Sequence, residues 1–136
     1  MSFGKILIVD YDAIACFITQ MALERNGYTG ELTFLDNAQD ALLLIQEESF
    51  DLILLELHTP GLEGFQFFER LAQIKLVRDK PIPIIIISTD VQYFMDQVKA
   101  LHSPNIKAYI TKPFLADHVD IIRSVTGELS WQGLEQ

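Results

Sequence analysis

Five short, mainly apolar runs punctuate the chain, and a longer segment with helical periodicity follows each of them. The runs cover residues 6–9, 31–34, 52–55, 84–87 and 107–110. A compact apolar run with polar residues at its ends is typical of a strand buried on both faces of a sheet. The run at 84–87 is four isoleucines, which is the strongest strand signal because β-branched residues favour strands. The run at 31–34 is half polar, which predicts an edge strand.

Apolar residues at helical spacing predict one helix after each strand. The expected inward-facing residues are Ile14, Phe17, Ile18 and Met21 in the first helix, Ala38, Ala41, Leu42 and Ile45 in the second, Phe65, Phe68 and Leu71 in the third, Phe94, Val98 and Leu101 in the fourth, and Leu115, Val119 and Ile122 in the fifth. Asp12 is the predicted cap of the first helix, and Asp36 or Asn37 caps the second. The third helix is expected to end at Asp79.

Five successive strand–helix units predict an α/β fold, a (βα)5 arrangement in which helices cover both faces of a five-stranded parallel sheet. We expect one domain over residues 1–125 and a polar tail over residues 126–136. Trp131 is expected to lie in a disordered terminal segment. No second domain is expected after the fifth helix, so the output would come from binding.

Charge and composition narrow the classes of function. The 136 residues carry a net charge of −9, which repels phosphate backbones and disfavours nucleic-acid binding. No apolar run approaches the ~20 residues of a membrane span, so no membrane association is expected. The single cysteine, Cys16, excludes an internal disulfide and is interpreted as an ordinary helix residue. These features predict a cytoplasmic protein.

Polar residues follow four of the predicted strands. Asp10, Glu56, Ser88 and Lys112 stand at the ends of the first, third, fourth and fifth strands. The carboxyl ends of parallel strands share one sheet edge, where open α/β folds bind ligands. Two acids beside an ammonium and a hydroxyl would suit a divalent cation with a phosphoryl group. Spacing alone supports equally well a salt bridge that neutralises buried carboxylates.

The chain resembles the receiver domain of two-component response regulators over about residues 5–125. The ordered signals are Lys-Ile-Leu-Ile-Val-Asp at 5–10, Asp51-Leu-Ile-Leu-Leu, Pro60-Gly61 with Gly64, Pro83 leading to Ser88, and Tyr109-Ile-Thr-Lys112-Pro113-Phe114. The fold implied by this resemblance is flavodoxin-like and doubly wound, with strand order 2-1-3-4-5. In this family a histidine kinase passes a phosphoryl group to an aspartate at the end of the third strand, with the help of magnesium.

The resemblance also implies roles for individual residues. Lys112 and Ser88 would contact the phosphoryl oxygens, and Ser88 and Tyr109 would be the switch residues that signal the state. Asp10 is the first acid of the pocket. Magnesium would be held by Asp10, Glu56 and the backbone carbonyl of His58. The imidazole of His58 would take no part in this contact.

Two departures from the family pattern affect this chemistry. Glu56 stands at the phosphoacceptor position, which moves the carboxylate outward by roughly an ångström. Tyr11 replaces the second acid of the first strand, and a phenol is a poor ligand for a hard cation. Thr89 is a smaller departure, at a position where the family usually keeps a small residue. We therefore expect weakened magnesium binding and impaired or absent phosphorylation.

These expectations describe a bacterial single-domain response regulator that is not an enzyme and acts by protein–protein interaction. Its partner would be a histidine kinase or a downstream signalling protein. The family's usual output face comprises the fourth helix, fifth strand and fifth helix. We expect a monomer or a weak homodimer. Glu56 would either mimic a phosphorylated aspartate or mark a decayed site that pairs with Lys112, and the sequence favours neither.

Three alternatives stay open. In the first alternative, Glu56 or a neighbouring acid still accepts phosphate from a histidine kinase. The second is a flavodoxin-like redox protein with flavin at the same strand ends, although residues 10–13 lack a phosphate-binding loop. The third is a small hydrolase with Asp10 as nucleophile, which ranks lowest because the remaining acids of a metal site are missing.

Overall fold

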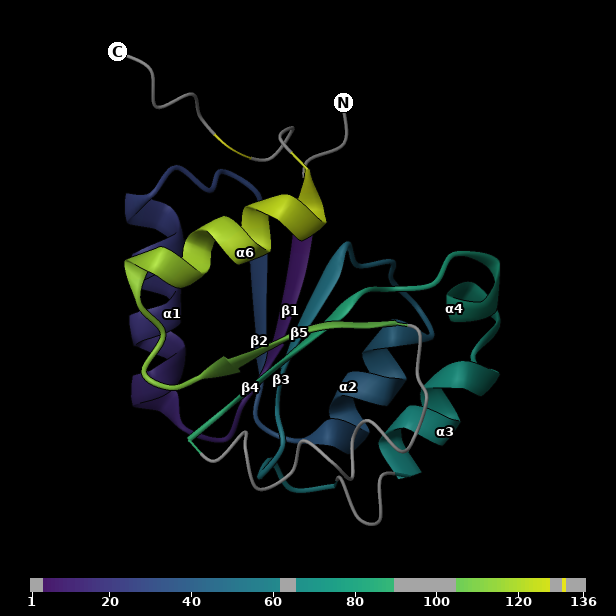
Figure 1. The fold of residues 1–136 in the computed structure, drawn as a ribbon. Helices are drawn as coiled ribbons and strands as arrows, with labels where there is room; N and C mark the ends of the chain where they lie inside the picture. Colours follow the sequence, from purple (N-terminus) through teal and green to yellow (C-terminus); the bar gives the residue numbers. More distant parts are fainter. Residues whose placement is uncertain (1–3, 62–65, 90–104, 128–130, 132–136) are drawn as a thin grey trace.

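A five-stranded parallel sheet forms the centre of the molecule, in the order β2-β1-β3-β4-β5 (Figure 1). The computed structural model describes residues 4–61, 66–89, 105–127 and 131. Its strands are β1 (Lys5–Val9), β2 (Glu31–Leu35), β3 (Leu52–Glu56), β4 (Ile84–Ser88) and β5 (Ile106–Thr111). All neighbouring strands run parallel. The predicted strands, their order and the edge position of β2 are confirmed.

Helices cover both faces of this sheet. On one face lie α1 (Ala13–Arg25) and α6 (Ala116–Thr126), and on the other lie α2 (Ala38–Ile45), α3 (Gln66–Gln73) and α4 (Lys75–Asp79) (Figure 1). Asp12 caps α1 by accepting from the backbone N–H groups of Ile14 and Ala15, and Asn37 caps α2. The predicted fourth helix, with Phe94, Val98 and Leu101, lies outside the described residues. None of the described helices is long and apolar enough to cross a membrane.

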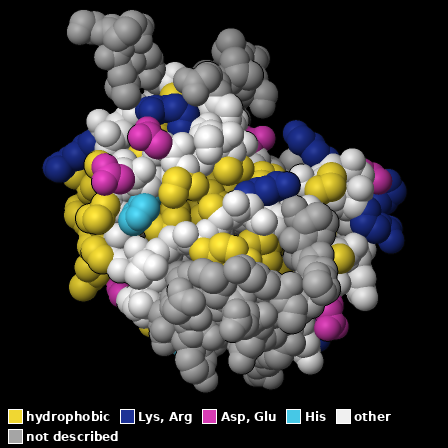
Figure 2. Space-filling model, in the orientation of Figure 1, with side chains coloured by type: hydrophobic (Ala, Val, Ile, Leu, Met, Phe, Trp, Pro, Cys, Tyr) yellow, Lys and Arg dark blue, Asp and Glu magenta, His cyan; other side chains and the backbone are white. Residues whose placement is uncertain are grey.

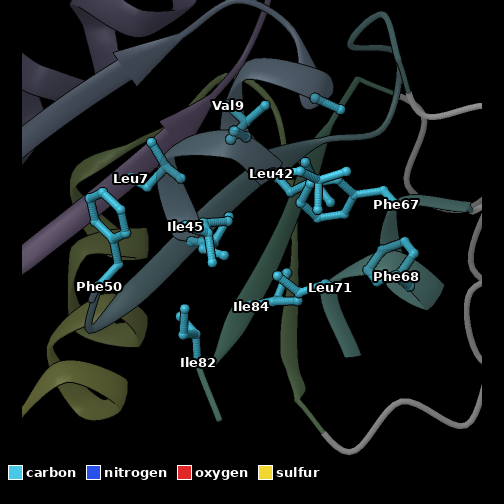
Figure 3. Packing of buried hydrophobic residues seen from close by; sticks show 14 of the residues in the cluster. Leu7, Val9, Leu42, Ile45, Phe50, Phe67, Phe68, Leu71, Ile82 and Ile84 are labelled. Carbon is cyan, nitrogen blue, oxygen red and sulfur yellow. The ribbon is translucent and has the colours of Figure 1, made fainter. Parts of the chain in front are cut away.

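The core consists of one apolar cluster on each face of the sheet. Alternate residues of each strand point to opposite faces, so Leu7 packs against α2 and α3 whereas Ile8 packs against α1 and α6. Figure 3 shows the first cluster, in which Leu42 and Ile45 of α2 meet Phe67 and other side chains of the sheet and α3. The predicted inward-facing residues Ala38, Ala41, Leu42, Ile45, Phe68, Leu71, Val119 and Ile122 are all buried. Phe65 lies outside the described residues.

The prediction for the buried face of α1 is wrong. Ile14 and Phe17 are 72% and 61% exposed, and Ile18 is also exposed. Thr19 and Leu23 face the sheet instead. Most positions of this helix are apolar, so helical periodicity fits more than one face. The buried face carries smaller side chains such as Cys16 and Ala22, which let the helix approach the sheet closely.

Two smaller helix predictions also need correction. The third predicted helix is two helices, because Ile74 adopts an extended backbone between α3 and α4. Leu115 is 54% exposed rather than inward-facing. It is the extended residue before α6, and the preceding Phe114 is buried in its place.

Trp131 is packed against the domain, which contradicts the expectation of a disordered segment at this residue. Its ring lies edge-on to Tyr28 at 5.1 Å between centroids, and the Arg123 guanidinium lies 4.6 Å from its centroid. Its Nε1 donates to Thr126 Oγ1 over 3.0 Å. Buried aromatic–aromatic and cation–π contacts of this kind hold an indole in place while its N–H stays satisfied.

Candidate functional site

At the carboxyl edge of the sheet the four strand-end residues Asp10, Glu56, Ser88 and Lys112 lie next to one another, and we call this site the strand-end pocket. Asp10 follows β1, Glu56 and Ser88 end β3 and β4, and Lys112 follows β5. Asp10, Glu56 and Ser88 are at most 5% exposed. The parallel register places Glu56 opposite Ile87, next to the end of β4, and the Lys112 N–H donates to the Ser88 carbonyl over 2.8 Å. Topology alone therefore assembles this pocket.

Lys112 bridges the two carboxylates. Its Nζ lies 2.8 Å from Asp10 Oδ2 and 2.7 Å from Glu56 Oε1. The other carboxylate oxygens accept from the backbone, Asp10 Oδ1 from the Asp12 N–H over 2.9 Å and Glu56 Oε2 from the His58 N–H over 3.1 Å. All four carboxylate oxygens are thus engaged, each with a donor.

The electrostatics of the pocket keep Lys112 charged. Burial by itself would lower the pKa of its ammonium, but hydrogen bonds to Asp10 and Glu56 and the charges of both carboxylates outweigh burial and raise this pKa above its ordinary value. Two acids share one base, so the pocket holds an excess negative charge. Because the three side chains are desolvated together, removal of one would leave an uncompensated buried charge.

The donor set of this pocket does not fit a magnesium ion. Magnesium requires oxygen ligands in near-octahedral geometry and prefers free carboxylates and water. Here the ammonium of Lys112 lies between the two carboxylates, and the remaining oxygens accept backbone N–H groups. Tyr11 adds a phenol rather than an acid, with its ring centroid 5.9 Å from Lys112 Nζ. Within the described ranges, no three His, Cys, Asp or Glu side chains gather as a metal-binding group.

The remaining predicted residues surround the pocket without joining the ion pairs. Tyr11 is about half exposed at its mouth. His58 is exposed and donates its backbone N–H to Glu56. Thr89 is exposed as well. Tyr109 packs partly buried against the cluster under α2 and α3, and burial raises the pKa of its phenol.

Two pocket neighbours were not predicted from the sequence. Thr59 is 2% exposed and its Oγ1 donates to the Val9 carbonyl over 3.3 Å, which ties the loop after β3 to the end of β1. The Cys16 thiol approaches the Asp10 carbonyl at 3.7 Å. Burial, with the Asp10 charge, raises the pKa of this thiol to about 11. Thr59 stands only three residues after Glu56, so its place near the pocket could have been inferred from the sequence. Cys16 was missed because the buried face of α1 was wrongly predicted.

A family model described as the response regulator receiver domain matches residues 6–125. The chain belongs to the response regulator receiver domain family. This receiver is 29% identical to Protein PilH of Pseudomonas aeruginosa, over 93% of this chain and 98% of PilH. It is 24% identical to the sensory/regulatory protein RpfC of Xanthomonas campestris over 82% of the chain, and it spans only 15% of the length of RpfC.

Solved receiver structures share the fold of the chain. The bacteriophytochrome response regulator RtBRR aligns with a TM-score of 0.79 over 99% of this receiver and 84% of that chain, at 23% identity. A CheY-like receiver domain from Methylobacillus flagellatus aligns with a TM-score of 0.74 over 91% of this receiver and 99% of that chain, at 18% identity. The flavodoxin-like architecture expected from the sequence is confirmed.

Proposed function

We propose that this receiver works by protein–protein contact in a conformation that does not require phosphorylation. Its membership of the family makes it a module of two-component signalling rather than a classical enzyme. The observation that carries the proposal is the closed bridge of Lys112 between Asp10 and Glu56. PilH, which the chain matches over nearly all of its length, supports the interpretation as a single-domain regulator.

The geometry of Glu56 argues against efficient phosphoryl transfer. A carboxylate that attacks phosphorus needs a lone pair aimed at the donor, and such transfer depends almost entirely on positioning and charge stabilisation. Glu56 Oε1 is 2.7 Å from Lys112 and Oε2 accepts the His58 N–H. The attacking oxygen would have to turn toward the donor against the contact that now orients it, and no magnesium would be held to neutralise the incoming charge. The reaction is therefore expected to be slow or absent.

The Glu56–Lys112 contact fits both interpretations of the substitution. A phosphate mimic would hold Lys112 where a phosphoryl oxygen otherwise holds it, and a decayed site would simply neutralise the ammonium. The two differ in what Glu56→Gln does. This change removes the charge and keeps the shape, so it would weaken partner binding if Glu56 is a mimic and leave it unchanged if the site has decayed.

To test the proposal, the protein is incubated with acetyl phosphate and magnesium, and phosphoryl transfer is measured as an increase in the mass of the intact protein. We expect no added phosphoryl group in the native chain or in Tyr11→Asp alone. The double variant Tyr11→Asp with Glu56→Asp should become phosphorylated, because it restores both acids of the family pattern. Native protein that is labelled as fast as the double variant would overturn the proposal and favour a receiver that still takes phosphate.

The partners follow from the family. We propose a histidine kinase or a downstream signalling protein, with a cytoplasmic location and a monomeric or weakly dimeric state. The first part is supported by relatives named as a sensory/regulatory protein, RpfC, and as a sensor histidine kinase, GacS. The net charge of −9 supports the exclusion of nucleic acid as a partner.

A further inference from the structure

A groove runs between α2 and the α3–α4 pair, on a different face from the strand-end pocket. Its volume is about 900 Å³. It is lined by Gln39, Leu42, Leu43, Gln46, Arg70, Gln73, Ile74, Lys75 and Leu76. None of the strand-end residues lines it, so nothing in the family chemistry of the pocket accounts for it. We call these nine residues the α2–α4 groove.

The charge beside this groove is opposite to that of the molecule. Arg70, Lys75, Arg78 and Lys80 fall within eleven residues and are four of the ten Lys and Arg in a chain of net charge −9. All four are exposed. Figure 2 shows dark-blue side chains gathered at the right of the view, around α4. No lining residue of the groove is acidic.

These cations are largely available for a ligand. Among the described residues, the only ion pair in this group is Lys75 with Asp79 at 2.6 Å. Both of its side chains are more than half exposed, so the pair is screened by solvent and contributes little stability. A partner carboxylate could replace Asp79 at low cost. Arg70, in the wall of the groove, has its planar guanidinium suited to bidentate carboxylate binding.

Exposed leucines complete the surface. Leu43 of α2 is 62% exposed and Leu76 of α4 is 38% exposed, on opposite walls of the groove. Between them Leu42 and Ile74 form a more buried apolar floor. The amides of Gln39, Gln46 and Gln73 add hydrogen-bonding groups without charge. An apolar floor with a basic rim is a surface that matches an amphipathic helix with apolar anchors and acidic flanks.

We propose that the α2–α4 groove binds an acidic amphipathic helix of a partner protein, with its apolar side chains between Leu43 and Leu76 and its carboxylates at Arg70 and Lys75. Charge complementarity selects this occupant. The inference concerns a separate face and holds whether or not Glu56 accepts phosphate, so its failure would leave the proposed function untouched.

The test uses the full chain labelled with ¹⁵N and a synthetic helical peptide with Leu at i, i+3, i+4 and i+7 and Glu elsewhere on its flanks. A second peptide keeps the leucines and replaces each Glu by Lys. We expect the acidic peptide to shift amide resonances of α2, α3 and α4, and the basic peptide to leave them in place. Arg70→Glu should weaken binding about tenfold. Arg25→Glu is the matched control, because Arg25 is an exposed helical arginine outside the groove.

The variants also separate the leucine contact from the charge. Leu43→Ser should weaken binding of the acidic peptide without changing the unfolding midpoint of the protein, since Leu43 is mostly exposed. Absence of shifts in the groove at millimolar acidic peptide would overturn the proposal, as would equal binding of both peptides. Vesicles containing phosphatidylserine serve as a competing probe. Binding to them that Arg70→Glu abolishes, with no peptide binding, would assign the surface to an anionic membrane and contradict the proposal.

Discussion

At the scale of single residues, Lys112 decides what the strand-end pocket can do. The Lys112 ammonium lies within hydrogen-bonding distance of the buried carboxylates of Asp10 and Glu56 and offsets part of their negative charge, which is a role that a metal ion would otherwise have. Such a buried bridge contributes less to stability than its short distances suggest, since all three groups have lost water. Its loss is nevertheless costly, because two buried acids would be left facing one another.

The first prediction follows from the difference between the small net stabilisation by the buried bridge and the large cost of removing its cation. Lys112→Met should lower the free energy of unfolding by about 3–5 kcal/mol. Lys75→Met removes an equally short ion pair whose side chains are 77% and 60% exposed, and should cost at most about 0.5 kcal/mol. Urea unfolding followed by Trp131 fluorescence measures both. Equal costs for the two variants would show that Lys112 does not hold the pocket together.

The second prediction concerns the Cys16 thiol. Its pKa is raised from 9.0 to about 11, chiefly by burial and then by the Asp10 charge. Only the thiolate reacts with iodoacetamide, so the folded protein at pH 8 should react about a hundredfold more slowly than the urea-unfolded chain. A rate profile that titrates near pH 9 in the folded protein would place the thiol in solvent.

The raised pKa of the Cys16 thiol also makes the free energy of unfolding depend on pH. The folded state holds this proton more tightly than the unfolded state, so the stabilisation is fully present below pH 9 and is lost as the pH rises toward about 11. The raised pKa of Lys112 acts in the same direction at alkaline pH. The free energy of unfolding should therefore fall above pH 9. A urea series across this range that stays flat would contradict the assigned environments of both groups.

At the scale of elements, the strands were predictable and helix faces were less so. Residues 52–55 and 84–87 are continuous apolar runs, and a strand buried on both faces requires such a run. In α1 the apolar residues surround the helix, so periodicity alone could not choose between Phe17 and Leu23. The break at Ile74 could not be foreseen either, because neither glycine nor proline marks it.

The third prediction tests the corrected face of α1. Leu23→Ala should destabilise the protein by about 2–5 kcal/mol, because Leu23 is fully buried and its truncation leaves a cavity. Phe17→Ala should change the free energy of unfolding by less than about 0.5 kcal/mol, because most of the ring already faces solvent. Thermal or urea unfolding of the two variants checks the contrast. A larger cost for Phe17→Ala would restore the face first predicted from the sequence.

At the scale of the whole molecule, the topology explains why so much of the site was predictable. A parallel sheet with order 2-1-3-4-5 brings the ends of β1, β3, β4 and β5 to one edge, so Asp10, Glu56, Ser88 and Lys112 had to be neighbours. Which oxygen meets which donor depends on rotamers and loop geometry, and the contact of Thr59 with Val9 spans 50 positions of sequence. The packing of Trp131 on Tyr28 joins segments that are even more remote in the chain.

The strand-end pocket and the α2–α4 groove are two separate surfaces of the domain. The strand-end pocket is closed by its own charges, whereas the α2–α4 groove carries exposed cations and leucines. A receiver whose pocket is fixed would still transmit a signal if its binding surfaces are presented in one conformation. Regulation would then act on the amount or location of the protein rather than on its phosphorylation.

The most direct measurement is a titration of magnesium, and then of magnesium with beryllofluoride, into the ¹⁵N-labelled native chain and the Tyr11→Asp, Glu56→Asp double variant. We predict that amide resonances around Asp10, Glu56, Ser88 and Lys112 stay in place in the native chain and shift in the double variant. Saturable shifts of these resonances in the native chain at millimolar or lower magnesium would contradict this prediction, because they would show that the pocket opens to accept a metal.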